Sequence, residues 1–146
     1  MNIYSYKDVS LAFVHPLVDS FFLTGEEGAG QIVISNTTDH TVHAVAADGT
    51  TMVSAVAGDN GHLTLEVQQT SSLQKTLLTW FNAVNTALKG GDVSNWANAV
   101  VVVRSLLDGA IHTLTGVSPL KNPDKTYAAQ GGNITWTLMA AKVISE

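Results

Sequence analysis

Residues 61–71, GHLTLEVQQTS, decide the fold of this chain, because they join a strand pattern directly to a helix start. Within this stretch the apolar side chains Leu63, Leu65 and Val67 alternate with polar ones. A period of two is typical of a strand that buries one face and exposes the other to water. The first seven residues of the stretch therefore predict a half-buried strand.

From residue 71 the apolar spacing changes to three or four, which is typical of one stripe on an α-helix. The stripe consists of Leu73, Leu77, Phe81, Val84 and Leu88. Ser71 and Gln74 have the spacing of a capping box, in which the serine hydroxyl accepts from an early helix N–H and the glutamine reaches back to the cap. Gly90 and Gly91 then end the pattern. We therefore expect a helix at about residues 71–89.

Several other short segments indicate strands, and most are bounded by Gly, Asn, Asp or Pro. They are residues 9–14, 20–24, 32–35, 42–46, 52–57, 100–105, 111–115 and 134–138. Many short strands with a single helix favour antiparallel pairing over a parallel sheet. We expect a mainly β fold, an antiparallel β-sandwich or barrel with one flanking α-helix, in a single domain over residues 1–146.

Residues 100–103 are four consecutive valines, so this strand is apolar on both faces. We expect the core to cover one face and the helix or a neighbouring subunit to cover the other, since a solvent-exposed edge of this kind would aggregate.

Two long connections, residues 37–60 and 117–130, indicate surface excursions. Ala47-Asp48-Gly49 and Asp59-Asn60-Gly61 are the turns of the first, at places where a positive φ is favoured. Long loops in a compact domain are commonly functional, and we assign these two to contacts between subunits.

The composition also points to buried surfaces. Charged residues make up 13% of the 146-residue chain, against about 25% in an ordinary soluble domain. An isolated monomer would have an unusually neutral surface, so we infer that other subunits cover part of it. The chain has no cysteine, which excludes disulfides and thiolate metal sites.

Membrane and nucleic-acid binding are both disfavoured. The longest aliphatic run, residues 99–103, is far shorter than the roughly 20 residues of a spanning helix. Residues 1–8 show neither the basic nor the apolar region of an export signal. The net charge is −5 with only 7 scattered Lys and Arg, whereas a DNA-binding protein must neutralise phosphates with basic side chains. We expect no stable membrane insertion and no specific DNA binding.

No pattern predicts a metal site. The histidines are His15, His40, His43, His62 and His112. His40 and His43 stand three apart on an expected strand, so their side chains would point to opposite faces. The glycines of residues 25–30 accompany Glu26 and Glu27 rather than a lysine, so a phosphate would be repelled and a flexible turn is the better interpretation.

Catalysis has no specific support either. Glu26 and Glu27 diverge on extended backbone and make a poor acid and base pair. No Gly-x-Ser-x-Gly elbow is present. Trp80, Trp96 and Trp136 could form a sugar-stacking platform, but in a small domain tryptophans are more often core or interface anchors. We expect no enzyme, and no catalytic, cofactor-binding or metal-binding residues.

Four motifs, in their order and spacing, carry a family resemblance. They are Tyr6-Lys7-Asp8-Val9, Leu23-Thr24-Gly25, the Ala47-Asp48-Gly49 turn with the strand and helix that follow it, and residues 127–136, YAAQGGNITW. Over residues 6–143 the chain resembles a family of phage tail tube proteins. The resemblance implies a structural subunit that assembles into stacked hexameric rings and forms the DNA conduit inside a contractile sheath.

The resemblance also implies partners and a location. The partners would be copies of the chain itself, the tail sheath, the baseplate and the tail terminator, and no cofactor is implied. The protein would reside in the virion tail after assembly in the host cytoplasm. Alternatives are the tube of a tailocin or type VI-like injection device, a glycan-binding β-sandwich module and, least favoured, a small hydrolase.

The negative net charge suits a channel through which DNA slides without sticking. Candidates for carboxylates in the lumen are Asp8, Asp19, Glu66, Asp92 and Asp108. If the channel instead bound DNA, Lys75 and Arg104 would be candidates to line it.

Overall fold

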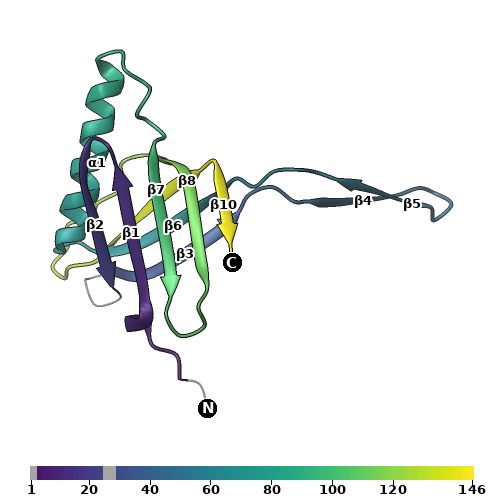
Figure 1. Ribbon diagram of the computed structural model, residues 1–146, viewed down its shortest axis with the longest axis horizontal. Helices are drawn as coiled ribbons and strands as arrows, with labels where there is room; N and C mark the ends of the chain where they lie inside the picture. Colours follow the sequence, from purple (N-terminus) through teal and green to yellow (C-terminus); the bar gives the residue numbers. More distant parts are fainter. Residues whose placement is uncertain (1–2, 25–28) are drawn as a thin grey trace.

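The computed structural model describes residues 3–24 and 29–146 (Figure 1). Its elements are short strands, a short 3₁₀ helix and one long α-helix. They are η1 (Tyr6–Asp8), β1 (Val9–His15), β2 (Val18–Thr24), β3 (Ala29–Asn36), β4 (Thr41–Val45), β5 (Thr51–Ala55), β6 (Gly61–Gln68), α1 (Ser72–Lys89), β7 (Ala99–Ser105), β8 (Ile111–Pro119), β9 (Asn133–Ala140) and β10 (Lys142–Ser145). The mainly β prediction is therefore confirmed.

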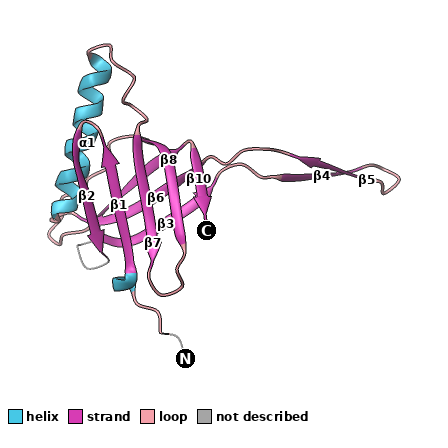
Figure 2. Cartoon of the chain, in the orientation of Figure 1, coloured by secondary structure: helices cyan, strands magenta, loops and turns pink. Residues whose placement is uncertain are grey.

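The strands form an antiparallel sandwich. The larger sheet runs in the order β2-β1-β7-β8-β9-β6-β3, and β10 pairs with β8. Strand β8 connects the two layers, because residues from Ile111 to Val117 pair with β7 and its end, Ser118 and Pro119, pairs with β9. Figure 2 shows β3 and β6 crossing behind β1, β2 and β7. Every described strand pairing is antiparallel, as expected.

The core lies between the two layers and uses the alternation seen in the sequence. Leu63, Leu65 and Val67 of β6 are at most 1% exposed. The opposite layer contributes Leu11 and Phe13 of β1, which are at most 2% exposed. The apolar residues of β9 complete the core, namely Ile134, Trp136 and Leu138. The strand predictions for these three segments are confirmed.

Gly61 has a different role from the one that we expected. It is the first residue of β6, it is buried, and it is not among the described glycines with positive φ. A Cβ at this position would collide with the carbonyl oxygen of Ser35 and lie 2.9 Å from Cγ2 of Val143. The glycine therefore permits a close approach of backbones rather than a tight turn.

The ends of α1 follow the prediction except for one contact. The Ser71 hydroxyl accepts from the Gln74 N–H over 3.3 Å, and Gly91 follows the helix with φ +90°. Gln74 does not reach back to the cap, so this part of the capping-box prediction is wrong. Its side chain is 5% exposed and its Oε1 accepts a hydrogen bond of 2.7 Å from Trp136 Nε1. Because Gln74 accepts from the buried indole of Trp136, its side chain is not available to cap the helix.

The buried stripe of α1 also differs from the prediction at two positions. Leu73, Leu77 and Val84 are buried as expected, but the third buried turn is occupied by Trp80 and not by Phe81. Phe81 is half-buried against Trp136, with ring centroids 6.4 Å apart. Leu88 is 39% exposed because the last turns of α1 extend past the sheet (Figure 1).

Near the C-terminus the structure has more strand than the sequence indicated. Strand β8 runs to Pro119, so the long connection covers residues 120–132 instead of starting at 117. Strand β10 was not predicted, because it contains only Val143 and Ile144 as apolar residues. Pairing with β8 defines it, and Val143 is only 8% exposed.

Candidate assembly surfaces

The excursion at residues 37–60 is an arm that extends away from the sandwich (Figures 1 and 2). Strands β4 and β5 pair with each other and form a separate sheet. All residues from 41 to 55 are exposed. We call residues 37–60 the arm. A two-stranded ribbon alone is marginally stable in water, so an arm of this length is expected to gain stability from contacts.

The base of the arm is held by hydrogen bonds. The Thr37 N–H donates to the Asn60 carbonyl over 3.0 Å, and the Val56 N–H donates to the His40 carbonyl over 2.9 Å. The Thr38 hydroxyl bonds to the Asn60 side chain. These bonds set the direction in which the arm leaves the sandwich.

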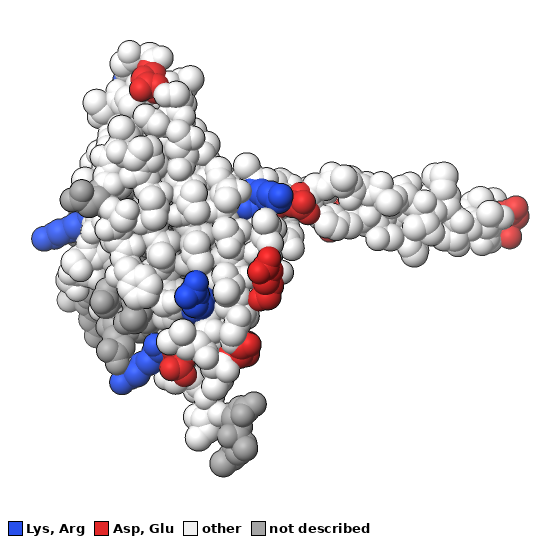
Figure 3. All heavy atoms as spheres, in the orientation of Figure 1, with Lys and Arg blue, Asp and Glu red and all other residues white. Residues whose placement is uncertain are grey.

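The tip of the arm is the predicted Ala47-Asp48-Gly49 turn. Gly49 has φ +90°, which confirms the need for glycine. The Thr50 N–H donates to Asp48 Oδ1 over 3.0 Å, and this bond lowers the pKa of the Asp48 carboxyl below its ordinary value. Asp48 is the only charged residue between 41 and 55. In Figure 3 the far end of the arm is acidic, the middle of the arm is uncharged, and further acidic side chains lie near its base.

Apolar side chains are exposed on both faces of the arm. In the β4–β5 register Ala44 lies opposite Met52 on one face and His43 lies opposite Val53 on the other. Met52 is 64% exposed and Val53 is 60% exposed. Exposed apolar groups in contiguous patches commonly mark interaction sites. The arm therefore has the character of an element that other chains cover.

The outer face of β1, β2 and β7 carries a groove of about 430 Å³. We call it the outer groove; its lining includes Lys7, Ala12, Phe22, Val102, Arg104 and Leu106. Phe22 is 64% exposed and Leu106 is 68% exposed. Figure 2 shows this face toward the viewer, and α1 does not lie in front of β1 and β7.

The four-valine segment supplies part of this groove. Val101 and Val103 face the core, while Val102 lies beside Ala12 on the outer face. Of the two covers that we expected for the second face, α1 is excluded by its position. This side of the strand is thus available to a neighbouring subunit.

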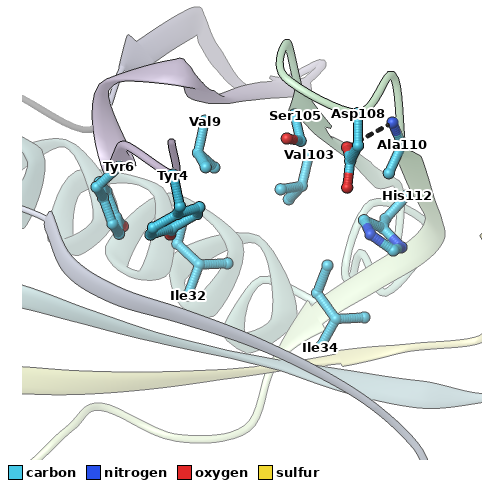
Figure 4. Close-up of a pocket in the computed structure, with 10 residues that line it drawn as sticks. All are labelled: Tyr4, Tyr6, Val9, Ile32, Ile34, Val103, Ser105, Asp108, Ala110 and His112. Carbon is cyan, nitrogen blue, oxygen red and sulfur yellow. Dashed lines mark hydrogen bonds between the residues drawn. The ribbon is translucent and has the colours of Figure 1, made fainter. Parts of the chain in front are cut away.

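A second cleft, of about 390 Å³, lies at the end of the sandwich away from the C-terminus of α1 (Figures 1 and 4). Among its lining residues, Tyr6 has a buried hydroxyl without a partner in the described part of the chain, and burial raises the pKa of Tyr6. Asp108 accepts from the Ala110 N–H over 3.0 Å, which lowers the pKa of Asp108. His112 Nδ1 lies 2.8 Å from the Ser145 hydroxyl. The Asp108 and His112 side chains are thus held by a local turn and a neighbouring strand, whereas the Tyr6 hydroxyl is not.

The histidines lie apart. His15 is buried, its Nε2 is 2.8 Å from the Asn95 carbonyl oxygen, and its Nδ1 accepts from the Leu17 N–H over 3.1 Å. His40 Nε2 lies 2.7 Å from the Gly58 carbonyl oxygen, and His43 is on the arm. His62 is on the outer face of β6. Within residues 3–24 and 29–146 no three His, Asp or Glu side chains gather as metal ligands would.

The carboxylates proposed for the lumen are dispersed. Asp8 ends η1, Asp92 follows α1 and Asp108 is in the β7–β8 turn. Glu66 is on the outer face of β6 and accepts from Asn133 Nδ2 over 2.7 Å. The Asp19 side chain, Glu26 and Glu27 lie outside the described part of the structure. Of the two basic candidates, Lys75 is exposed on α1 and Arg104 is exposed at the outer groove.

The tryptophans are anchors and do not form a platform. Trp80 and Trp136 are 0% exposed, and Trp96 packs half-buried against the core. The interpretation as core residues is confirmed, and a glycan-binding module has no exposed tryptophan to use. Among the described residues no helix is both long and apolar enough to cross a bilayer.

Sequence reasoning missed Phe22 and Leu106 as surface residues. The pair Phe21-Phe22 contained a usable signal, because neighbouring residues of a strand point to opposite faces. Phe21 stacks on Phe13 with ring centroids 4.9 Å apart, so Phe22 faces outward.

The fold is shared with chains of contractile injection systems. A chain in the sheath–tube complex of the extracellular system PVC in the extended state is 12% identical, with TM-score 0.60, covering 97% of this chain and 90% of that one. A chain in the PVC sheath/tube terminator is 11% identical, with TM-score 0.62 and 100% and 98% covered. A chain in the baseplate of the anti-feeding prophage is 14% identical, with TM-score 0.58 and 100% and 93% covered.

The exposed arm and the groove on the outer face are surfaces of the kind that structural subunits bury against other chains. The sequence model of the bacteriophage PhiTE tail tube protein family matches residues 1–145, and the chain belongs to this family. It is a structural subunit of a tail tube, and hence a component of a phage or injection-system tail. The resemblance inferred from the sequence is confirmed. No curated protein matches this sequence.

Proposed function

We propose that residues 1–146 act as one tail-tube domain that assembles into hexameric rings, which stack into a hollow tube inside a contractile sheath. The observation that carries this proposal is the arm, whose apolar side chains are exposed on both faces. In a tube, neighbouring copies of the chain would cover both apolar faces of the arm. The low charge content of 13% has the same explanation.

The tube would contact the sheath along its length, the baseplate at one end and a terminator at the other. Support comes from the similar chains, which belong to a sheath–tube complex, a sheath/tube terminator and a baseplate. Such a subunit assembles in the host cytoplasm and is part of the virion tail when the phage leaves the cell. It acts through its rigidity and its lumen, so it needs no catalytic residue.

A second candidate is the tube of an injection device that carries no phage genome. It is favoured by one observation, namely that the similar structures are described as an extracellular contractile injection system and an anti-feeding prophage. Genes for a capsid and a terminase near this gene would favour the phage tail, whereas genes for effectors would favour the device.

The test of self-assembly removes the arm and keeps the sandwich. Residues 41–55 are replaced by a short Gly-Ser turn, which leaves the eight-stranded sheet intact because β4 and β5 pair with each other. We expect the wild-type chain to polymerise and the shortened chain to remain as small species with an unchanged far-ultraviolet spectrum of the body. A replacement inside the loop of residues 120–132 is the control for shortening an exposed segment. If the shortened chain formed the same polymer as the wild type, the arm would not be an assembly element.

A further inference from the structure

We propose that the outer groove is the receptor for the arm of a second copy of this chain, and that Asp48 of the arm meets Arg104 of the groove. This inference rests on the proposed self-assembly. It adds to it the surface that receives the arm and the contact that fixes the register.

The two surfaces are complementary in apolar character. The groove is lined by the half-buried Ala12 and Val102 and by the exposed side chains of Phe22 and Leu106. The arm offers exposed apolar side chains of matching kind, Met52 among them. Docking would remove both sets from water.

The charges are complementary as well. Asp48 is the only charged residue between positions 41 and 55, and it is at the tip. The charged residues that line the groove, Lys7 and Arg104, are both basic. Figure 3 shows the acidic far end of the arm, and on the body both basic and acidic side chains, so the complementarity belongs to the groove lining and not to the whole face. Opposite charges on two surfaces favour one docking register and disfavour others.

The geometry requires that the arm and the groove come from different copies. The arm points away from the sandwich, and the groove is on the outer face of β1 and β7 (Figure 1). The contact therefore joins two different patches, head to tail. Such heterologous contacts repeat from copy to copy and produce closed rings or open helical filaments. A tube made of stacked subunits needs contacts of this type.

Crosslinking tests the contact directly, since the chain has no cysteine of its own. The variants Asp48→Cys and Arg104→Cys are mixed before assembly and treated with a short bismaleimide. Asp48→Cys mixed with Asn82→Cys is the matched control, because Asn82 is exposed on α1 and far from the groove lining. The proposal predicts a dimer band for Asp48→Cys with Arg104→Cys and little for the control. Electron microscopy of the same samples records whether rings or tubes have formed.

The two proposals fail in different ways. If assemblies form and the Asp48→Cys and Arg104→Cys mixture crosslinks no better than the control, the groove is not the receptor, while self-assembly stands. If no assembly forms under any condition, both proposals are wrong. A crosslink from Arg104→Cys to purified sheath protein in place of the arm would also contradict the proposal, because it would assign the groove to the sheath.

A charge exchange between Asp48 and Arg104 is a second test of the contact. Both residues are exposed, so their substitution should leave the fold intact. Arg104→Asp should raise the protein concentration needed for assembly by about two- to fivefold for each contact, which is the worth of an exposed ion pair. Adding Asp48→Arg to the same chain should restore assembly. If the double variant assembled no better than the single one, the two residues would not be paired.

Discussion

Trp136 of β9 donates its indole N–H to Oε1 of Gln74 on α1 over 2.7 Å, and both side chains are buried. The bond joins the one described α-helix to β9, in the layer that contains β9, β6 and β3. A buried indole N–H without an acceptor would lose the hydrogen bond that it makes with water in the unfolded chain. Gln74 is therefore a structural residue of the core.

Replacement of Gln74 tests this bond. We expect Gln74→Leu to lower the free energy of unfolding by about 1–2 kcal/mol, because it leaves the Trp136 N–H unsatisfied. In a Trp136→Phe background the same change should cost nothing, since the donor is gone and the Gln74 Nε2, which has no partner in the described structure, is removed. Urea unfolding of the four chains measures the coupling. An equal cost in both backgrounds would contradict the role of the bond.

The buried stripe of α1 predicts which helix residue supports the core most. Trp80 is 0% exposed, and its ring packs edge-to-face against Phe13 with the ring centroids 4.9 Å apart. Trp80→Ala should therefore cost about 3–5 kcal/mol through the cavity that it leaves. Leu88→Ala, at a 39% exposed position in the last turn, is the control and should stay within about 0.5 kcal/mol. Thermal unfolding checks both, and similar melting temperatures for the two variants would show that the stripe is misassigned.

Gly61 predicts a backbone effect. Gly61→Ala should destabilise by about 1–3 kcal/mol or more, because the new Cβ collides with the Ser35 carbonyl and pushes β3 from β6. Gly131→Ala is the matched control, since no atom lies within 4 Å of a Cβ there. Soluble expression and melting temperature provide the comparison. A Gly61→Ala chain as stable as Gly131→Ala would mean that β3 and β6 are not in such close contact.

Charge predicts how an assembled tube treats DNA. The chain has 12 acidic and 7 basic residues, and the described carboxylates are spread over the surface. Assembled tubes should show no measurable affinity for double-stranded DNA at physiological salt, because few basic side chains are available to replace phosphate counterions. Filter binding on intact tubes gives the result. Micromolar, salt-sensitive binding would contradict it and would direct attention to Lys75 and Arg104.

Much of the fold could be predicted because its elements depend on residues that are close together in the sequence. The alternation in residues 61–67 and the cap at Ser71 depend on near neighbours in the chain, and both are confirmed. The identity of the buried helix residue was harder, since Trp80 and Phe81 are adjacent and only the position of the sheet decides between them.

The assembly surfaces depend on distant parts of the chain, so the sequence located them only in part. It placed an excursion at residues 37–60, but a pattern cannot tell whether two strands join the main sheet or leave it as an arm. The bond between Gln74 and Trp136 joins residues 62 positions apart. The groove requires β1, β2 and β7 together, and it became visible only when these strands were placed side by side.

The central claim is that this chain builds a hollow tube from copies of itself. Electron microscopy of the purified wild-type protein, with averaging of end-on views, tests it most directly. We expect stacked rings of six subunits around an open lumen, and light scattering that gives multiples of the 15.4 kDa chain. A uniform monomer at high protein concentration, with no rings in any view, would contradict the claim.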